Sequence, residues 1–189
     1  MKSSVLDVAK IKDLRVLFLA KYADYRGDQS KASTEEDKIV IKYNGEIACI
    51  LSELFPNLTC SSDPSVVLDK ELKSKYDYVF SLYNRMPFRN SEIFVSAVLE
   101  YHRIPYFGAR PNTRAIAEDK VYAKILAQHA GIPTPVWRIY DEYSSNLAEP
   151  PFSGPFFVKP RFGAASAYIT SDSLCKDWCA AQKQVCKLI

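Results

Sequence analysis

The chain has 189 residues, a net charge of +3 and a charged content of 25%. A hydrophobic content of 48% is typical of a folded globular protein and excludes a disordered chain. The basic excess is small and dispersed, which argues against a nucleic-acid partner. No apolar run approaches the roughly 18–20 residues that cross a bilayer, and no signal-peptide core is present at the amino terminus. We therefore predict a cytoplasmic protein without a membrane partner.

The five cysteines form an odd set without a CxxC pair, and both histidines lie far from them in the sequence. Zinc sites usually draw four ligands from closely spaced pairs. Cys175 and Cys179 are one helical turn apart, but this pair alone does not make such a site. We predict reduced structural thiols rather than a metal site or a redox role.

Short apolar runs in the first part of the chain predict buried parallel strands at residues 14–20, 76–82 and 104–108. A polar stretch, residues 21–37, is predicted to be a long loop. Helical patterns lie between the strands, so the sequence predicts an α/β domain with a parallel sheet. Ligands of such sheets bind beyond the carboxyl ends of the strands, here after Ala20 and Leu82.

Two amphipathic helices are predicted in this part, from Ile39 to Phe55 and from a cap at Ser91 onward. The helical period predicts an inward face for each of them. For the first helix this face is Ile39, Tyr43, Ile47, Ile50, Leu51 and Leu54, and for the second it is Ile93, Phe94, Ala97, Val98 and Tyr101.

A domain boundary is predicted between residues 111 and 112. Beyond it the sequence predicts one helix that Gly131 closes, an extended strand, a linker, a hairpin and a last helix. The last helical pattern reaches the end of the chain without a capping residue, which indicates a truncated domain. The predicted bounds are 114–130 for the helix, 132–140 for the strand, 141–155 for the linker, 156–159 with 167–170 for the hairpin, and 173–189 for the last helix.

An ordered set of short motifs occupies residues 104–170. These are Ile-Pro-Tyr-Phe-Gly at 104–108, Asp119-Lys120 in a helix, Gly-Ile-Pro-Thr-Pro at 131–135, Val158-Lys159-Pro160, and a loop of small residues at 161–166. In this order and spacing they resemble the ATP-grasp fold, particularly the D-alanine–D-alanine ligases. The resemblance implies a pre-ATP-grasp, Rossmann-like domain at residues 1–111. Residues 112–189 would then be the first α+β subdomain of a truncated ATP-grasp domain.

The resemblance implies that Lys120 and Lys159 contact the phosphates of ATP from two sides. Lysines supply point charges to phosphate oxygens, and a loop of small residues lets backbone N–H groups approach them. The cover over the phosphates would be the loop from Arg161 to Ser166. Its binding residues would be Gly163, Ala164, Ala165 and Ser166, although the family usually has Gly-Ser-Ser where this chain has Ala164-Ala165-Ser166.

The substrate side departs from the family more strongly. Ligases that join two D-alanines carry a His-Gly motif after the strand that here ends at Leu82, whereas this chain has Tyr83 to Asn90. Asn84, Arg85 and Arg89 are candidates for binding a substrate carboxylate, because arginine binds carboxylates through paired hydrogen bonds. A solvated loop before the next helix is the more common role of such residues and stays the alternative. The acidic run at 35–37 fits either a substrate ammonium or the start of a helix.

The implied reaction is ATP-dependent ligation of a carboxylate to an amine through an acyl phosphate, with Mg²⁺ as cofactor. In the family the metal ligands and the adenine contacts follow the region that this chain covers, so we expect no metal ligands and no turnover from these 189 residues. The expected partners are ATP, amino-acid substrates and, by analogy, a second copy of the chain. Two alternatives stay open: an ATP-grasp enzyme with another substrate, and a non-catalytic module for nucleotide binding or assembly.

Overall fold

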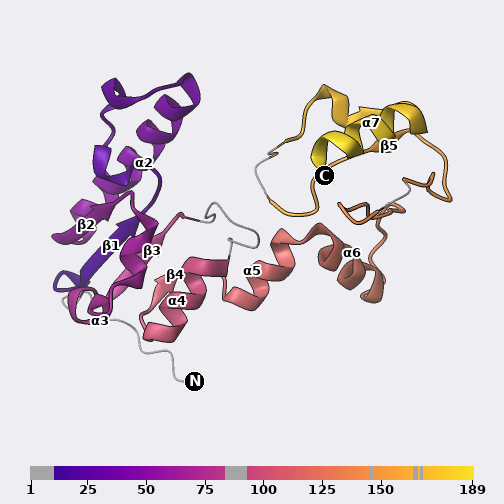
Figure 1. Ribbon diagram of the computed structural model, residues 1–189. Coiled ribbons are helices and arrows are strands. Elements are labelled where there is room, and N and C mark those ends of the chain that lie inside the picture. The colour runs from indigo at the N-terminus through magenta and orange to yellow at the C-terminus, as the bar shows by residue number, and fades with distance from the viewer. Residues whose placement is uncertain (1–10, 84–92, 145–146, 164–165, 167) are drawn as a thin grey trace. The chain divides into compact units, whose positions relative to one another are not determined.

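The computed structural model describes residues 11–83, 93–144, 147–163, 166 and 168–189. The chain divides into two compact units, Met1–Arg114 and Ala115–Ile189, which we call unit 1 and unit 2 (Figure 1). The division falls three residues after the boundary expected from the sequence. The assignment of the two parts to a pre-ATP-grasp domain and an ATP-grasp domain stays a prediction.

Unit 1 is built on a four-stranded parallel sheet in the order β2-β1-β3-β4. The three predicted strands are confirmed as β1 (Arg15–Leu19), β3 (Tyr78–Ser81) and β4 (Tyr106–Phe107). β2 (Asn57–Ser61) was not predicted, because this edge strand has no apolar run and none of its residues is fully buried. The sheet confirms the α/β class.

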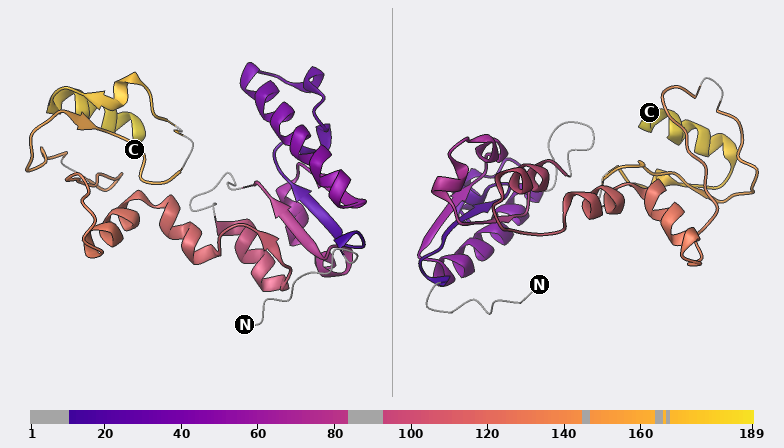
Figure 2. Two further views of the ribbon diagram at one scale, coloured as in Figure 1. Left: turned by 180° about the vertical axis from the view of Figure 1, so that it is seen from behind. Right: turned by 90° about the horizontal axis from the view of Figure 1, so that it is seen from below.

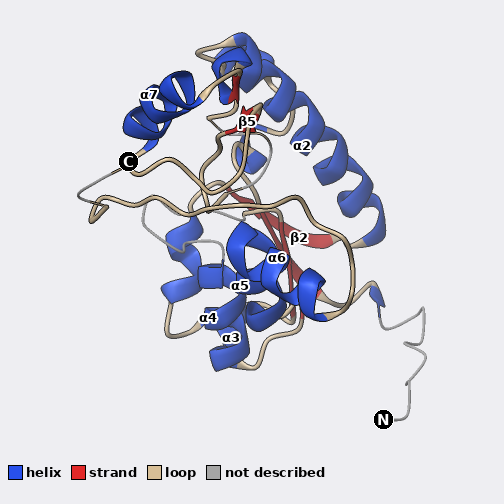
Figure 3. Ribbon diagram, turned by 90° about the vertical axis from the view of Figure 1, so that its right-hand side faces the viewer, coloured by secondary structure: helices blue, strands red, loops and turns tan. Residues whose placement is uncertain are grey.

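Helices cover both faces of this sheet (Figures 1 and 2). Side chains alternate along a strand, so Leu17 and Leu19 of β1 face one layer and Phe18 faces the other. The first layer contains α3 (Leu72–Lys75) and α4 (Phe94–His102), and the second contains α2 (Glu35–Leu54). Figure 3 shows α2 alongside the sheet. In the described part of the chain, no helix has both the length and the apolar character needed to cross a membrane.

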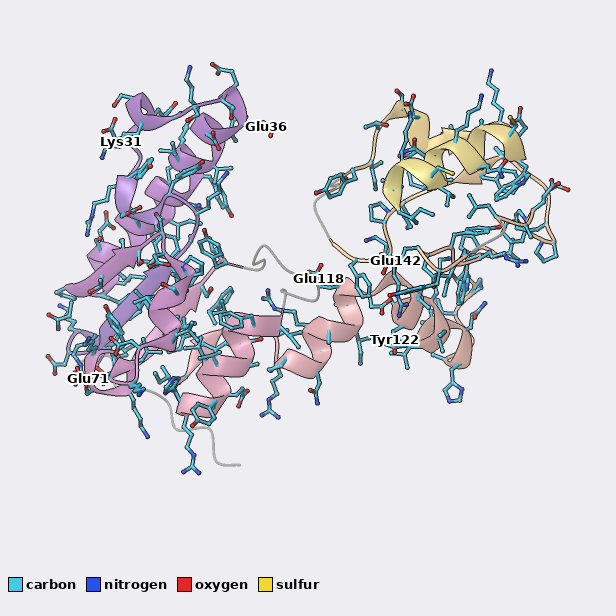
Figure 4. All side chains as sticks on the ribbon, viewed as in Figure 1. Lys31, Glu36, Glu71, Glu118, Tyr122 and Glu142 are labelled. Atoms are coloured by element: carbon cyan, nitrogen blue, oxygen red, sulfur yellow. The ribbon has the colours of Figure 1, made fainter. Side chains whose placement is uncertain are left out.

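The predicted long loop at 21–37 is wrong in two respects. It contains two 3-10 helices, Ala23–Tyr25 and Gln29–Lys31, and its last residues already belong to α2. Thr34 is the N-cap, whose hydroxyl accepts a hydrogen bond from the Asp37 amide at 3.1 Å. The acidic run therefore forms the first turn of α2, at the end marked by Glu36 in Figure 4.

The predicted inward face of α2 is right at Ile47 and Leu51, which pack in the core, and wrong at the exposed residues Ile39, Tyr43, Ile50 and Leu54. Ile39 is 69% exposed and Tyr43 is 61% exposed, whereas Ile41 is fully buried. Two contacts that a hydrophobic pattern cannot reveal set this face. The amide of buried Asn44 donates to the carbonyl of Lys21 at 2.6 Å, and Gly45 lies against Gly27 so closely that a Cβ on Gly45 would stand 2.5 Å from the Gly27 Cα.

The predicted face of α4 is likewise right only in part: Phe94 and Val98 pack against the core, but Tyr101 does not. Val95 and Leu99 are buried, while Tyr101 is 84% exposed. The predicted cap at Ser91 lies outside the described residues. The error arises because α4 has apolar residues on several sides, so the period alone does not select the face that meets the sheet.

Unit 2 corrects three predictions. The single helix is two helices, α5 (Pro111–Glu118, shared with unit 1) and α6 (Lys120–His129), which Asp119 separates. The described residues 132–140 form no strand. β5 (Phe156–Phe157) pairs antiparallel with β6 (Leu174–Cys175) instead of with residues 167–170.

The start of the last helix, predicted at residue 173, is corrected as well: α7 is Trp178–Leu188, because residues 174 and 175 belong to β6. α7 packs on this strand pair around buried Phe156, Cys175 and Ala181. The predicted cap at Gly131 is confirmed by its φ of 72° and by the hydrogen bond from its amide to the Gln128 carbonyl. The five cysteines are not bonded to one another; Cys175 is buried in this core, whereas Cys49, Cys179 and Cys186 are exposed.

We predict that Ile41→Ala lowers the free energy of unfolding by about 2–5 kcal/mol, because it leaves a cavity beneath α2. The matched change Ile39→Ala, two residues away on the exposed side, should change stability by less than about 0.5 kcal/mol. Urea unfolding of both variants measures the difference. Equal losses would show that the face of α2 is assigned wrongly.

Candidate functional site

Lys120 and Gly163 lie next to each other in unit 2, although 43 residues separate them in the sequence. The Lys120 ammonium donates to the Gly163 carbonyl at 2.6 Å, and the Lys120 amide donates to the Arg161 carbonyl at 3.1 Å. The beginning of α6 is thus joined to the segment that follows β5. These are two of the segments that the sequence analysis assigned to one phosphate site.

Asp119 holds this junction together. Its carboxylate accepts hydrogen bonds from the amides of Val121 and Tyr122, which makes it the N-cap of α6. The same carboxylate accepts from Arg161, at 2.9 Å from Nε and 2.7 Å from the terminal nitrogen. Asp119 is 3% exposed. Burial alone would raise the pKa of its carboxyl, but the hydrogen bonds from Arg161 and the two amides outweigh this effect and the pKa is lowered.

The Arg161 guanidinium also lies close to two aromatic rings. Its guanidinium carbon lies 5.4 Å from the centre of the Tyr122 ring and 4.9 Å from that of Phe162. Tyr122 lies on α6 in the first turn after the cap (Figure 4). The guanidinium is thus held by a carboxylate and two rings, and the backbone that leads to Gly163 is anchored to α6.

Two other residues predicted to bind phosphate, Lys159 and Ser166, are described and are exposed. Lys159 is exposed, two residues after the end of β5. Ser166 is exposed and has a left-handed backbone with φ of 55°, and its carbonyl accepts from the Ile169 amide. Ala164, Ala165, Asn84, Arg85 and Arg89 lie outside the described residues, so their predicted roles stay predictions.

Lys124 was not among the residues predicted from the sequence. It follows Lys120 by four residues on α6, and its ammonium donates to the Thr134 hydroxyl at 2.7 Å and to the Pro135 carbonyl at 3.1 Å. Burial lowers the pKa of Lys124, and the positive charge of Lys159 lowers it further. The spacing of Lys120 and Lys124 on one helical face was the signal that could have identified this residue.

The described residues contain no group of three or more His, Cys, Asp or Glu side chains that could hold a metal ion.

In unit 1, charged and phenolic groups gather where β1, β2 and β3 end. Burial raises the pKa of Tyr83, whose hydroxyl also lies within the field of Lys21, Asp63 and Asp24. In the order β2-β1-β3-β4, the chain leaves β1 toward one edge of the sheet and leaves β3 toward the other edge. Ligands of open parallel sheets bind at such a point, beyond the carboxyl ends of the two strands.

Asp37 is already occupied by protein donors. It accepts from the Tyr22 hydroxyl at 2.8 Å and from the Lys21 ammonium at 3.0 Å, and these hydrogen bonds lower its pKa to about 2. For Asp37, this arrangement favours the helix-start explanation of the acidic run over a substrate ammonium.

Comparison with known proteins agrees with the motifs. The chain is 27% identical over 183 residues to a D-alanine–D-alanine ligase of Acetivibrio thermocellus, which covers 90% of this chain and 48% of that protein. It is 31% identical over 104 residues to a D-alanine–D-alanine ligase of Oleidesulfovibrio alaskensis, which covers 55% of this chain and 34% of that protein.

A third relative, D-alanine–D-alanine ligase B of Chromobacterium violaceum, is 34% identical over 110 residues, 57% of this chain and 36% of that protein. The chain is similar to the D-alanine–D-alanine ligases. It spans between about a third and a half of the length of these ligases. No family model matches the chain. No solved structure matches it either.

We predict that Arg161→Met destabilises the protein by roughly 2–4 kcal/mol, because Asp119 stays buried without its counter-charge. The range lies below that of a fully enclosed pair, since the Arg161 side chain is 35% exposed. Thermal and urea unfolding measure the loss. A loss no larger than that of an exposed ion pair would contradict the role given to Asp119.

Lys187→Met is the matched control, because it breaks a pair with Asp172 in which both side chains are 63% exposed. It should cost less than about 1 kcal/mol.

The pH dependence of stability gives a second check. The folded pKa of Asp119 is below its unfolded value, so its contribution is present above about pH 4 and is lost as the pH falls through the folded pKa. The difference between wild type and Arg161→Met should therefore shrink in acid.

Proposed function

We propose that the chain is the ATP-binding, amino-terminal part of a carboxylate–amine ligase that resembles the D-alanine–D-alanine ligases. The contact between Lys120 and Gly163 carries this proposal. It joins a helix lysine to the Gly-containing segment after β5, and these are the two parts that a triphosphate site of the resembled fold requires. The similarity to three curated ligases supports the same assignment.

In the proposed reaction, ATP transfers its γ-phosphoryl group to a substrate carboxylate and leaves as ADP. An amine then attacks the acyl phosphate, phosphate leaves, and an amide bond is formed. Catalysis of phosphoryl transfer consists mainly of positioning and charge neutralisation, so no side-chain nucleophile is needed. The contribution of this chain is charge and position: Lys120 and Lys159 bind phosphate oxygens, and the Asp119–Arg161 pair fixes the segment beside Lys120.

The proposed domain organisation follows from this function. Residues 1–111 would be the pre-ATP-grasp domain and residues 112–189 the first part of the nucleotide-binding domain. The relatives are two to three times as long as their matched regions. We therefore propose that residues outside these 189 supply the ligands for Mg²⁺ and the contacts to adenine.

The two substrates are proposed to be amino acids, with identities other than two D-alanines. Tyr83 to Asn90 replaces the segment in which the resembled ligases carry their His-Gly motif. Tyr83 lies at the carboxyl edge of the sheet beside charged residues that follow β1 and β2. Ligands of open parallel sheets bind at such an edge, which supports the proposed substrate role of this segment.

We predict that Lys120→Met and Lys159→Met each weaken ATP binding about ten-fold or more, the effect of losing one charge-assisted hydrogen bond. Isothermal titration calorimetry with ATP measures it. Lys183→Met, which removes an exposed lysine of α7, is the control and should bind as wild type does. Unchanged affinity in both site variants would contradict the nucleotide site and favour the assembly module.

We predict that the 189-residue chain alone shows no ligase turnover and binds nucleotide weakly, because the proposed metal ligands lie outside it. A coupled assay of ADP release, run with mixtures of amino acids and Mg²⁺, tests this prediction. Robust turnover that Lys120→Met abolishes would keep the ligase assignment but disprove the need for further residues.

A further inference from the structure

A row of large apolar side chains lies on the exposed side of α2. Ile39 is 69% exposed, Tyr43 61%, Ile50 57% and Leu54 54%. At 3.6 residues per turn, these four positions fall within about 60° of one another around the helix axis, so they form one stripe, which we call the α2 stripe. The outer side of a helix usually carries polar residues, and a continuous row of exposed apolar residues indicates a contact with another molecule.

The spacing of the α2 stripe is the same when it is read in either direction. Its midpoint lies between residues 46 and 47, and Ile39 and Leu54 are equally far from it in the sequence, as are Tyr43 and Ile50. A contact with a two-fold axis uses the same surface on both copies, and such an axis can relate two antiparallel helices. An axis at this midpoint would set Ile39 opposite Leu54 of the second copy and Tyr43 opposite Ile50. The α2 stripe is therefore complementary to itself.

The charged residues beside the stripe agree with this arrangement. Lys42 and Glu53 are exposed on the same flank of the stripe, and neither forms an ion pair within the described residues. About a two-fold axis of this kind, each flank faces the same flank of the second copy. Lys42 is two positions from the residue that would face Glu53, which is about 3 Å along the helix axis. The contact would therefore contain two symmetric ion pairs.

Glu46 lies on the same flank, next to the midpoint of the stripe, and is exposed. In the two-fold arrangement, the two copies of Glu46 would lie near each other. Like charges that face each other across a contact oppose association. A variant without this charge should therefore associate more tightly than the wild type.

We propose that the α2 stripe is the contact surface between two copies of this chain, whose α2 helices pack antiparallel about a two-fold axis. The proposal concerns unit 1 and does not depend on the proposed function. A contact between two helices is small in comparison with standard protein interfaces, so we expect a weak dimer with a dissociation constant in roughly the micromolar range.

Sedimentation velocity of the full 189-residue chain, from about 1 μM to about 1 mM, tests the proposal. Wild type should change from monomer to dimer over this range. Tyr43→Ser should weaken the dimer about ten-fold or more, because an aromatic residue near the centre of a contact contributes strongly to its stability. The control is Tyr101→Ser, which removes an exposed tyrosine of α4 and should associate as wild type does.

A charge exchange tests the arrangement of the two helices. Lys42→Glu and Glu53→Lys should each weaken the dimer roughly ten-fold, since each turns two attractive pairs into repulsive ones, and the double variant should restore the affinity. Glu46→Gln should tighten the dimer. These three side chains are exposed, so the variants should fold as wild type does, which circular dichroism checks.

The results separate this contact from others. A dimer that Tyr43→Ser weakens and that the charge exchange restores would support the proposal. A wild-type chain that stays monomeric over the whole range would overturn it. A dimer that Tyr43→Ser and Glu46→Gln leave unchanged would place the contact on another surface. A double variant that associates no better than the single ones would overturn the antiparallel arrangement.

Discussion

The carboxylate of Asp119 joins segments of unit 2 that are 42 residues apart in the sequence. It begins α6 by accepting from two amides and accepts at the same time from Arg161, so one buried group sets both the direction of the helix and the path of the chain after β5. Removing a carboxylate from water is costly unless donors replace the lost hydration, and here three protein groups supply them. The positions of Lys120 and Lys124 on α6 depend on this cap, as does the approach of the Gly163 carbonyl to Lys120.

The same cap explains why one predicted helix is two. The sequence from Arg114 to Ala130 has a continuous helical period, and nothing in it is a strong helix breaker. Asp119 is nevertheless extended, with φ of −91° and ψ of 102°, because its side chain replaces the carbonyl acceptors that the next helical turn would have used. An aspartate in mid-pattern is ambiguous in sequence. Its hydrogen bonds with Arg161 hold it as the N-cap of a new helix, and that pairing depends on tertiary structure.

The other predictions divide in the same way, into features set by local sequence and features set by tertiary contacts. The strands β1 and β3 were predictable because a short continuous apolar run is typical of a parallel strand that is buried on both faces. The faces of α2 and α4 were not, because a close contact between Gly27 and Gly45, a buried Asn44 and a surplus of apolar residues decide them. In the candidate site, the motifs identified Lys120 and Gly163, whose contact the structure contains. They missed Lys124, whose setting depends on Thr134 and on the neighbouring charge of Lys159.

The proposed phosphate site relies on charge more than its resembled relatives do. Where the family usually has Gly-Ser-Ser, this chain has Ala164-Ala165-Ser166, so fewer hydroxyl donors are available to a triphosphate. Lys120 supplies a different kind of donor: its ammonium carries a full charge, and its hydrogen bond to the Gly163 carbonyl orients that charge beside the loop.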